Sequence, residues 1–260
     1  MPRFAANLSL MFAEVPFLDR FDAAARAGFT AVEFLFPYDH PAEEIGERLR
    51  RNGLAQALFN LPPGNWDAGE KGFAALPDRF ADLQQSLRVA LPYAQATGVG
   101  RLHLMAGIAE RGDPRAVAAF RKSAIAAAGF FAPYGIDVVI EPINPRNVPG
   151  YFLNDFGFAR DLVLELKIPN LKLQFDIYHC GIIHGDVTMR LREMMPIIGH
   201  IQIASIPSRH EPDGEELNYP FLFTELDRLG YGGFVGCEYN PRGNTTDGLG
   251  WFRPYAGAKP

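Results

Sequence analysis

The fold is predicted best by one stretch, Asp137-Val138-Val139-Ile140-Glu141-Pro142-Ile143-Asn144. Its run of β-branched apolar residues predicts a buried strand, because a parallel strand covered on both faces carries a near-continuous hydrophobic run. The run stops at Glu141, and Pro142 marks where the chain leaves the sheet. A buried carboxylate is costly unless a counter-charge or a metal ion pairs with it. The stretch therefore predicts a strand that ends in a carboxylate with a partner.

The same pattern, a short apolar strand followed by a helix, recurs along the chain. Strands are predicted at residues 4–9, 31–36, 54–59, 101–105, 137–140, 171–176, 200–204 and 234–238. Helices are predicted at residues 16–27, 41–53, 79–97, 114–134, 154–167, 186–197 and 221–229. Regular alternation is typical of a parallel sheet, and a closed barrel of this kind usually takes about 250 residues. We therefore predict an α/β protein with a single domain over residues 1–260, a (β/α)8 TIM barrel. An open doubly wound sheet is the alternative.

Composition and charge narrow the class of protein. The chain has 260 residues, 48% hydrophobic and 21% charged, as in ordinary globular proteins. Its net charge of −5 argues against nucleic acid as a partner, and its apolar runs are shorter than the roughly 20 residues of a membrane helix. The N-terminus leads directly into a predicted strand rather than a signal peptide, and Cys180 and Cys237 form no CxxC pair. We expect a cytoplasmic protein without a membrane or nucleic-acid partner.

Two long polar loops follow predicted strands. Residues 61–78 have no sustained helical or strand period and contain Trp66, and residues 205–219 contain Arg209 and His210. Loops of this length inside a compact domain are often functional lids. Trp66 is therefore a candidate for closing over a bound substrate. A surface turn with one buried tryptophan is the alternative interpretation.

Four oxygen-bearing side chains stand at the ends of the last four predicted strands: Glu141, Asp176, Gln202 and Glu238. In a TIM barrel the carboxyl ends of the strands form the face that carries the active site. Carboxylates that meet there repel one another unless a cation lies among them. An all-oxygen set suits a hard divalent cation, so we predict a Mg²⁺ or Mn²⁺ site. At each single position, the alternative is a solvated or salt-bridged side chain. Four such side chains at the ends of successive strands favour the metal site.

Six segments carry a family resemblance: residues 4–9, 60–64 with 68–70, 140–144, 175–179, 200–204 and 236–239. They resemble the hydroxypyruvate isomerase family, which belongs to the xylose isomerase-like TIM barrel superfamily. Residues 33–38 (Glu-Phe-Leu-Phe-Pro-Tyr) are among the motifs shared with the related 2-oxo-tetronate isomerases. The resemblance covers nearly the whole chain.

The resemblance implies a metal-assisted isomerase. Its metal ligands would be Glu141, Asp176, Gln202 and Glu238, and Glu141 and Glu238 would form the proton-transfer pair. Ketose 3-epimerases of the same superfamily look similar but carry histidine at the position of Gln202. This difference disfavours an epimerase and, because a neutral amide is a poor ligand, weakens the expected affinity for metal.

Further side chains are candidates for substrate binding: His179, Arg209, His103, Asn7, His210 and Trp66. His179 follows Asp176 by three residues, as in the Asp-x-x-His pattern of the superfamily, and a loop histidine packed on the rim is the alternative. Arg209 and His210 would bind a substrate carboxylate, since guanidinium and carboxylate pair bidentately. An ion pair of Arg209 with an acidic residue of its own loop is the alternative. Glu33 is at most a supporting residue.

These parts predict one reaction. Isomerising an α-hydroxy carbonyl compound requires removal of a proton from one carbon and return of a proton to its neighbour through an enediolate. We predict interconversion of hydroxypyruvate and tartronate semialdehyde (2-hydroxy-3-oxopropanoate), with a small hydroxy-oxo acid as the bound molecule. The alternatives are a 2-oxo-tetronate isomerase, a ketose 3-epimerase, and a barrel that binds a sugar acid without converting it.

Two further expectations concern partners. Phosphodiester cleavage, the activity of endonuclease IV-like members of the superfamily, is disfavoured by the small number of histidines and the sequence pI of about 5.7. The aromatic tail around Trp251 and Phe252 indicates either a contact within a homo-oligomer or a cap on the barrel.

Overall fold

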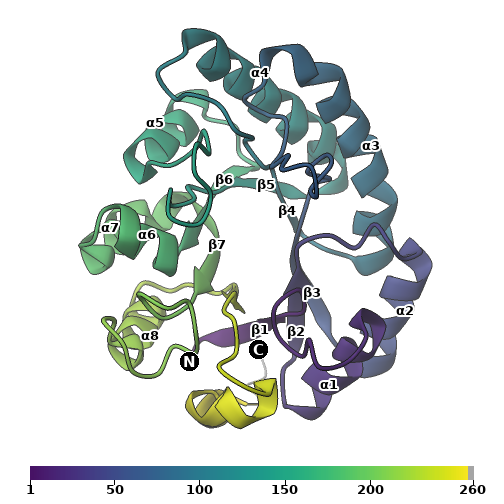
Figure 1. The fold of residues 1–260 in the computed structure, drawn as a ribbon, viewed down its shortest axis with the longest axis vertical. Helices are drawn as coiled ribbons and strands as arrows, with labels where there is room; N and C mark the ends of the chain where they lie inside the picture. The colour runs from purple at the N-terminus through teal and green to yellow at the C-terminus, as the bar shows by residue number, and fades with distance from the viewer. Residues whose placement is uncertain (257–260) are drawn as a thin grey trace.

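A closed ring of eight parallel strands forms the centre of the computed structural model, which describes residues 1–256 (Figure 1). The strands are β1 (Arg3–Asn7), β2 (Ala31–Phe34), β3 (Ala55–Asn60), β4 (Arg101–His103), β5 (Asp137–Ile140), β6 (Leu171–Asp176), β7 (Ile198–Ile203) and β8 (Phe234–Cys237). Each strand pairs with the next along the chain, and β1 also pairs with β8, where Ala5 lies opposite Gly236. This last pairing closes the sheet. The predicted (β/α)8 TIM barrel is confirmed, and the open doubly wound sheet is excluded.

The helices surround the ring of strands (Figure 1). They are α1 (Arg20–Arg26), α2 (Ala42–Asn52), α3 (Phe80–Thr97), α4 (Pro114–Phe131), α5 (Phe156–Leu166), α6 (Ile177–Ile183), α7 (Val187–Met194) and α8 (Tyr219–Arg228). Local sequence sets several helix starts: Asp113 caps α4 and Asp155 caps α5, each accepting a 2.8 Å hydrogen bond from a backbone N–H of the first turn. Within residues 1–256, none of the helices combines the length and the apolar character that crossing a bilayer requires.

The segment after β6 differs from the prediction. The sequence pattern predicts one helix at residues 186–197, whereas the structure has α6 directly after β6 and then α7. The pattern hides α6 because Asp176 is both the last residue of the strand and the N-cap of the helix. Its Oδ1 accepts a 2.8 Å hydrogen bond from the backbone N–H of Tyr178. His179 therefore lies in the first turn of a helix, which excludes the alternative interpretation of it as a loop histidine.

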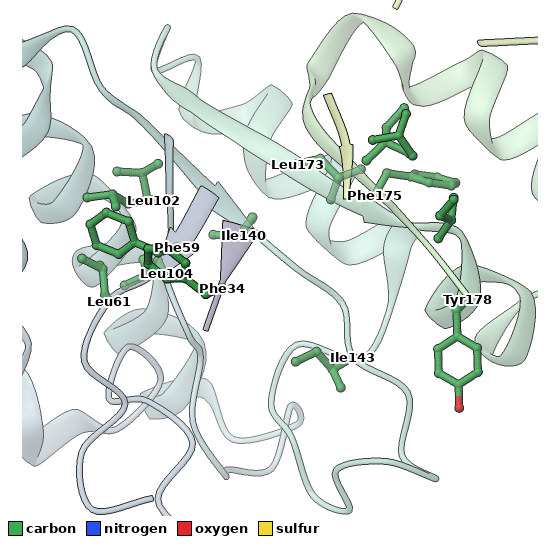
Figure 2. Close-up of a cluster of buried hydrophobic side chains, with 14 of the residues drawn as sticks. Phe34, Phe59, Leu61, Leu102, Leu104, Ile140, Ile143, Leu173, Phe175 and Tyr178 are labelled. Carbon is green, nitrogen blue, oxygen red and sulfur yellow. The ribbon is translucent and has the colours of Figure 1, made fainter. Parts of the chain in front are cut away.

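Apolar side chains pack densely around the strands. Figure 2 shows part of this core, with Phe34 and Phe59 beside Leu102 at the β2–β4 side and Leu173 and Phe175 on β6. The rings of Phe34 and Phe59 are stacked with their centroids 6.0 Å apart. Burying each large apolar side chain of this kind away from water contributes about 1.5–3 kcal/mol to the free energy of unfolding. This packing fixes the strand ends and hence the side chains that they carry.

Polar side chains occupy the inside of the ring near the strand ends. Side chains of a strand alternate between its two faces, so residues two apart point the same way. The alternation places Gln174 and Asp176 of β6 on the inner face, and it does the same for His200 and Gln202 of β7. All four are buried. A buried polar group needs a hydrogen-bond partner, so these residues predict a connected network inside the barrel.

The aromatic tail packs against its own chain. Phe252 stacks on Phe29 with ring centroids 4.1 Å apart, and Trp251 meets the ring of Phe4 edge-on at 5.1 Å. Phe4 belongs to β1, so the tail covers the outside of the strand that closes the ring. The structure thus favours the interpretation of the tail as a cap, and the homo-oligomer stays a prediction.

Candidate active site

A cavity of about 290 Å³ lies at the carboxyl ends of the strands. Its polar lining consists of Asn7, Asn60, Trp66, Lys71, His103, Glu141, Asn147, Tyr151, Gln174, His179, Gln202, Arg209 and Glu238. Pockets for small ligands begin at about this volume. The cavity therefore suits a small metabolite, and it lies at the face where TIM barrels carry their active sites.

Carboxylates reach this face from three strands. Glu141 follows β5, Asp176 ends β6 and Glu238 follows β8, and all three are buried. One carboxylate oxygen each of Glu141 and Asp176 and one ring nitrogen of His179 lie within 4.8 Å of one another. Neighbouring parallel strands bring their carboxyl ends to one edge, which is why residues 35 positions apart in the chain meet here.

His179 is held by Asn144. Its Nδ1 lies 3.3 Å from the backbone N–H of Asn144 and 2.6 Å from Nδ2 of the same residue. Both groups donate, so Nδ1 accepts and the ring proton sits on Nε2. Burial, with the positive charge of Arg209 nearby, holds the pKa of His179 well below its usual value, so the ring is neutral. Nε2–H then lies 3.6 Å from Asp176 Oδ2, too far for a hydrogen bond, and is available to a substrate oxygen.

Gln202 is fixed on both sides of its amide. Its Nε2 donates to Glu33 Oε1 at 2.8 Å, and its Oε1 accepts from Gln174 Nε2 at 2.6 Å. Glu33 can only accept when ionised, which determines which end of the Gln202 amide faces it. The amide oxygen of Gln202 is thus already hydrogen-bonded, and it keeps one lone pair for a further partner.

Glu33 is the centre of the network that lies beneath the cavity. Asn7 donates to its Oε1 at 3.0 Å, and His200 Nε2 lies 2.7 Å from its Oε2. A Cβ at position 236 would collide with both carboxylate oxygens, so Gly236 makes room for them. With Gln202, three donors bind this one buried carboxylate, so Glu33 supports the residues of the site from behind, the position that the sequence allows for it.

Sequence reasoning missed Gln174 and His200. The available signal was alternation, because Gln174 precedes Asp176 by two residues and His200 precedes Gln202 by two. A strand residue two positions before a rim residue points into the same barrel interior. Applying that rule to β6 and β7 would have identified both residues.

Arg209 lies among the carboxylates. Its Nη2 is 3.1 Å from Glu238 Oε1, and its guanidinium carbon lies 5.1 Å from the centre of the Tyr178 ring. The negative charges of Glu238, Asp176 and Glu141 raise the pKa of Arg209 although burial opposes this. Arg209 thus pairs with a residue of the site and not, as the alternative interpretation had it, with an acidic residue of its own loop.

His103 and Asn7 both line the cavity, as the sequence predicts. His103 is buried, and its Nδ1 lies 3.7 Å from Glu141 Oε2. Burial, with His200 nearby, lowers the pKa of His103 to about 3, so its ring is neutral. Within residues 1–256 both of its ring nitrogens lack a hydrogen-bond partner. A neutral imidazole in this state is suited to bind a substrate hydroxyl or carbonyl group.

The two remaining predicted residues differ in position. Trp66 lines the cavity with 39% of its surface exposed, and Phe36 packs beside it with ring centroids 5.1 Å apart. His210 is absent from the cavity lining, as far as residues 1–256 are concerned. Its Nδ1 lies 2.6 Å from the carbonyl oxygen of Asn240, and its backbone N–H donates to Ser205. The structure therefore gives His210 a role in holding the loop after β7.

Burial raises the pKa of all three carboxyl groups. The pKa of Glu141 lies well above its usual value because of burial and the nearby charges of Glu238 and Asp176. Burial raises the pKa of Asp176 to about 6 and that of Glu238 to about 8, and Arg209 opposes both shifts. Groups whose pKa values lie near neutrality can exchange protons at physiological pH, which is what general acid–base catalysis requires.

The residues fit a divalent cation. Oε1 of Glu141 and Oδ2 of Asp176 are buried and lack hydrogen-bond partners among residues 1–256. A buried carboxylate oxygen without a partner is costly, and a cation would satisfy both of these. Glu141 and Asp176 are therefore candidate metal ligands, whereas His179 beside them already uses the lone pair of its Nδ1 to accept from Asn144. Glu238 and Gln202 border the same cavity, the first bound to Arg209 and the second to Gln174.

The raised pKa of Glu238 predicts how the cation-free protein responds to pH. A carboxyl group whose pKa is higher in the folded state stabilises the fold fully below its ordinary pKa and loses that contribution as pH rises to the folded value. Between pH 6.5 and 8, the free energy of unfolding in EDTA should fall by up to about 2 kcal/mol through Glu238, at about 1.4 kcal/mol per pH unit. Urea titrations at both pH values measure this loss.

Glu238→Gln is the control for the pH prediction. The variant has no carboxyl group at this position, so its stability should fall less over the same interval. Saturating Mg²⁺ or Mn²⁺ should also reduce the loss in the natural protein, because a cation stabilises the ionised carboxylates. Equal pH dependence of the two proteins in EDTA would contradict the assignment of the titration to Glu238.

The fold and the site together define a class: a TIM-barrel protein with a buried carboxylate–histidine cluster at the carboxyl ends of its strands. Comparison with known proteins gives the family. The chain belongs to the xylose isomerase-like TIM barrel family, whose model matches residues 21–255. The predicted resemblance is thereby confirmed.

Curated relatives match the full length of the chain. A 2-oxo-tetronate isomerase of Cupriavidus necator is 54% identical over 99% of this chain and all of its own length. A second, from Pectobacterium atrosepticum, is 49% identical over 98% of each chain. The hydroxypyruvate isomerase of Escherichia coli is 40% identical over 98% of this chain and its own full length. The prediction of an isomerase of this kind is confirmed by these relatives.

Solved structures agree on the fold. A structure from Brucella melitensis, titled an AP endonuclease of family 2, has 51% identity and a TM-score of 0.96, covering 98% of this chain and all of that one. A D-psicose 3-epimerase has a TM-score of 0.78 with 15% identity over 99% of this chain and all of its own. The likeness to the epimerase shows the shared barrel alone.

Proposed function

We propose that this chain is an isomerase that moves a carbonyl group between C2 and C3 of a short hydroxy-oxo acid. The simplest reaction of this kind interconverts hydroxypyruvate and tartronate semialdehyde. One observation carries the proposal: Glu141 and Glu238, from β5 and β8, line the same cavity in a chain whose full-length relatives are named isomerases. Two carboxyl groups at one cavity supply the base and the acid that the reaction needs.

The two glutamates perform the proton transfer. One carboxylate removes the proton from the carbon that bears the hydroxyl group, which leaves an enediolate. The hydroxyl proton passes to the former carbonyl oxygen, and a carboxyl group returns a proton to the former carbonyl carbon, so that the carbonyl and hydroxyl groups have exchanged places. The raised pKa of Glu238, about 8, keeps this group able to accept and release a proton near neutral pH.

The neighbouring residues orient the substrate and the catalytic groups. Nε2–H of His179 and the ring of His103, whose nitrogens have no hydrogen-bond partner among residues 1–256, are hydrogen-bonding groups for substrate oxygens. Arg209, bonded to Glu238, orients that carboxylate. Leu35, Ile143 and Val148 contribute apolar lining that limits water around the reacting carbons.

The proposed cofactor is Mg²⁺ or Mn²⁺. Glu141 and Asp176 would hold it, with Glu238 and the free lone pair of Gln202 as the remaining oxygen donors. A divalent cation bound there would polarise the substrate carbonyl and stabilise negative charge on the adjacent oxygens. Oxygen donors favour these two hard cations over softer metals.

A second substrate, 2-oxo-tetronate, is favoured by the pattern of identity. The relatives at 54% and 49% identity carry this name, whereas those named hydroxypyruvate isomerase are at 43% or less. The two acids share the same reacting centre, a C2 carbonyl next to a C3 hydroxyl. The four-carbon acid differs by one CH₂OH group on C3. We therefore expect turnover of both acids by the same residues, with the higher kcat/KM on 2-oxo-tetronate.

Proton NMR of the purified protein with each acid tests the proposal. The expected result is conversion of both acids in the presence of Mg²⁺ or Mn²⁺, and its loss in EDTA. Parallel samples contain fructose and a duplex with an abasic site, because one similar structure is titled an AP endonuclease. Cleavage of the duplex, epimerisation of fructose without turnover of either acid, or binding of both acids without conversion would each overturn the proposed function.

A further inference from the structure

A second cationic side chain, Lys71, lines the cavity. It belongs to the loop between β3 and α3, and its Nζ lies 3.3 Å from the centre of the Trp66 ring. Nζ makes one long hydrogen bond, 3.5 Å, to the carbonyl oxygen of Trp66. Its acidic neighbour Glu70 is bound instead by Arg79. The charge of Asp67 also acts on Lys71, but the hydrogen bond of Nζ among residues 1–256 is the long one to Trp66. The ammonium group in the cavity lining therefore has donors left for a ligand.

The backbone around Lys71 is anchored. The N–H of Gly72 donates to the carbonyl oxygen of Pro63 at 2.8 Å, and the N–H of Ala75 donates to that of Ala106 at 2.7 Å. Gly72 has a φ of +104° and lies so close to the backbone of Met105 that a Cβ would collide with it. These contacts tie the loop to the segment after β4. Lys71 is therefore held at the cavity before any ligand binds.

The charged groups in and directly behind the cavity lie on two sides of it. Glu141, Asp176 and Glu238 come from β5, β6 and β8, whereas Lys71 comes from the loop after β3. In the ring, β3 lies opposite β7, the strand before Arg209. Arg209 is bonded to Glu238 and surrounded by carboxylates. An anionic group is attracted to the side of Lys71, and the carboxylate side repels it unless a cation offsets the three negative charges.

We propose that Lys71, packed against Trp66, binds the carboxylate of the substrate and thereby selects hydroxy-oxo acids over neutral ketoses. The inference rests on the proposed function, because it names the residue that recognises the acid group of that substrate. It also assigns this role to Lys71 in place of Arg209 and His210, to which the sequence pointed. The stack on Trp66 restricts the flexible lysine side chain, so less rotational freedom is lost when the carboxylate binds.

Lys71→Met tests the assignment in the isomerase assay. A charged hydrogen bond to a part of the substrate that does not react stabilises ground state and transition state equally. KM for 2-oxo-tetronate should therefore rise about 10- to 100-fold, with kcat changed less than about threefold. Lys71→Arg, which keeps the charge, should restore most of the affinity. The matched control is Lys122→Met, which removes a lysine stacked on Phe80 at 3.7 Å outside the cavity.

Calorimetry separates this inference from the proposed function. Erythronate is a four-carbon hydroxy acid without the reactive carbonyl group, and erythritol is its neutral counterpart. The natural protein and Lys122→Met should prefer erythronate, and Lys71→Met should lose that preference. If Lys71→Met still preferred erythronate to erythritol, or lost kcat with an unchanged KM, the role of Lys71 would be overturned. Failure of the natural protein to convert either oxo acid would overturn the proposed function and leave the calorimetric test of Lys71 intact.

Discussion

Glu238→Gln is expected to lower kcat by about 10³- to 10⁴-fold while the barrel stays folded. The amide has nearly the shape of the carboxylate, and its oxygen can still accept the hydrogen bond from Arg209. It cannot take up or return a proton. The step that moves hydrogen between C2 and C3 therefore loses one of its two carriers. Steady-state kinetics on 2-oxo-tetronate and hydroxypyruvate measure the loss of kcat, and thermal unfolding shows whether the barrel stays folded.

Two controls separate proton transfer from other roles of Glu238. Glu165→Gln neutralises an exposed glutamate paired with Arg121 and should leave kcat unchanged. The double variant Glu141→Gln/Glu238→Gln should be about as slow as either single variant, because residues that act as a unit are not additive. Activity of Glu238→Gln within tenfold of the natural protein would remove Glu238 from the proton-transfer pair.

Asp176→Asn is expected to weaken binding of Mn²⁺ by at least about 100-fold and to abolish cation-dependent turnover. Asp176 is fully buried and, within residues 1–256, is absent from the cavity lining, so its charge has no direct use in binding substrate. Its Oδ1 caps α6, and an asparagine keeps this hydrogen bond. The change therefore removes the negative charge while keeping the local structure. Free Mn²⁺ measured by electron paramagnetic resonance gives the affinity without an activity assay.

The matched control for this variant is Asp113→Asn. Asp113 also caps a helix with Oδ1, at the start of α4, but it belongs to no cluster of potential metal ligands within residues 1–256. The Asp113→Asn variant should bind Mn²⁺ with the same affinity as the natural protein. Equal Mn²⁺ affinity of Asp176→Asn and the natural protein would show that the cation binds elsewhere or that the cluster binds none.

Much of the fold could be predicted because its signals are local. The valines before Glu141 indicate a buried strand within a few residues of sequence, and the alternation of strands and helices indicates a barrel. The helix α6 was missed because Asp176 serves two elements at once, ending β6 and capping the helix. A short window of sequence assigns such a residue to only one element.

The candidate site was predictable to the extent that it depends on strand ends. Glu141, Asp176 and Glu238 each end or follow a strand, and the rule for parallel barrels brings such positions to one face. The network beneath them depends on contacts across the ring. Glu33 bonds to Gln202, 169 residues away, and its burial becomes apparent only when β2 and β7 are placed inside the same closed sheet.

The sequence by itself determined the barrel and the strands that carry carboxylates, because hydrophobic periodicity and strand-end residues are encoded over short distances. Its short motifs also carried the resemblance to the family. The tertiary structure decided the partners: Arg209 pairs with Glu238, His210 holds its loop, and Lys71 lines the cavity. These side chains lie on loops whose paths are set by packing against other loops. Their positions therefore follow from the folded chain as a whole and have no periodic signature in the sequence.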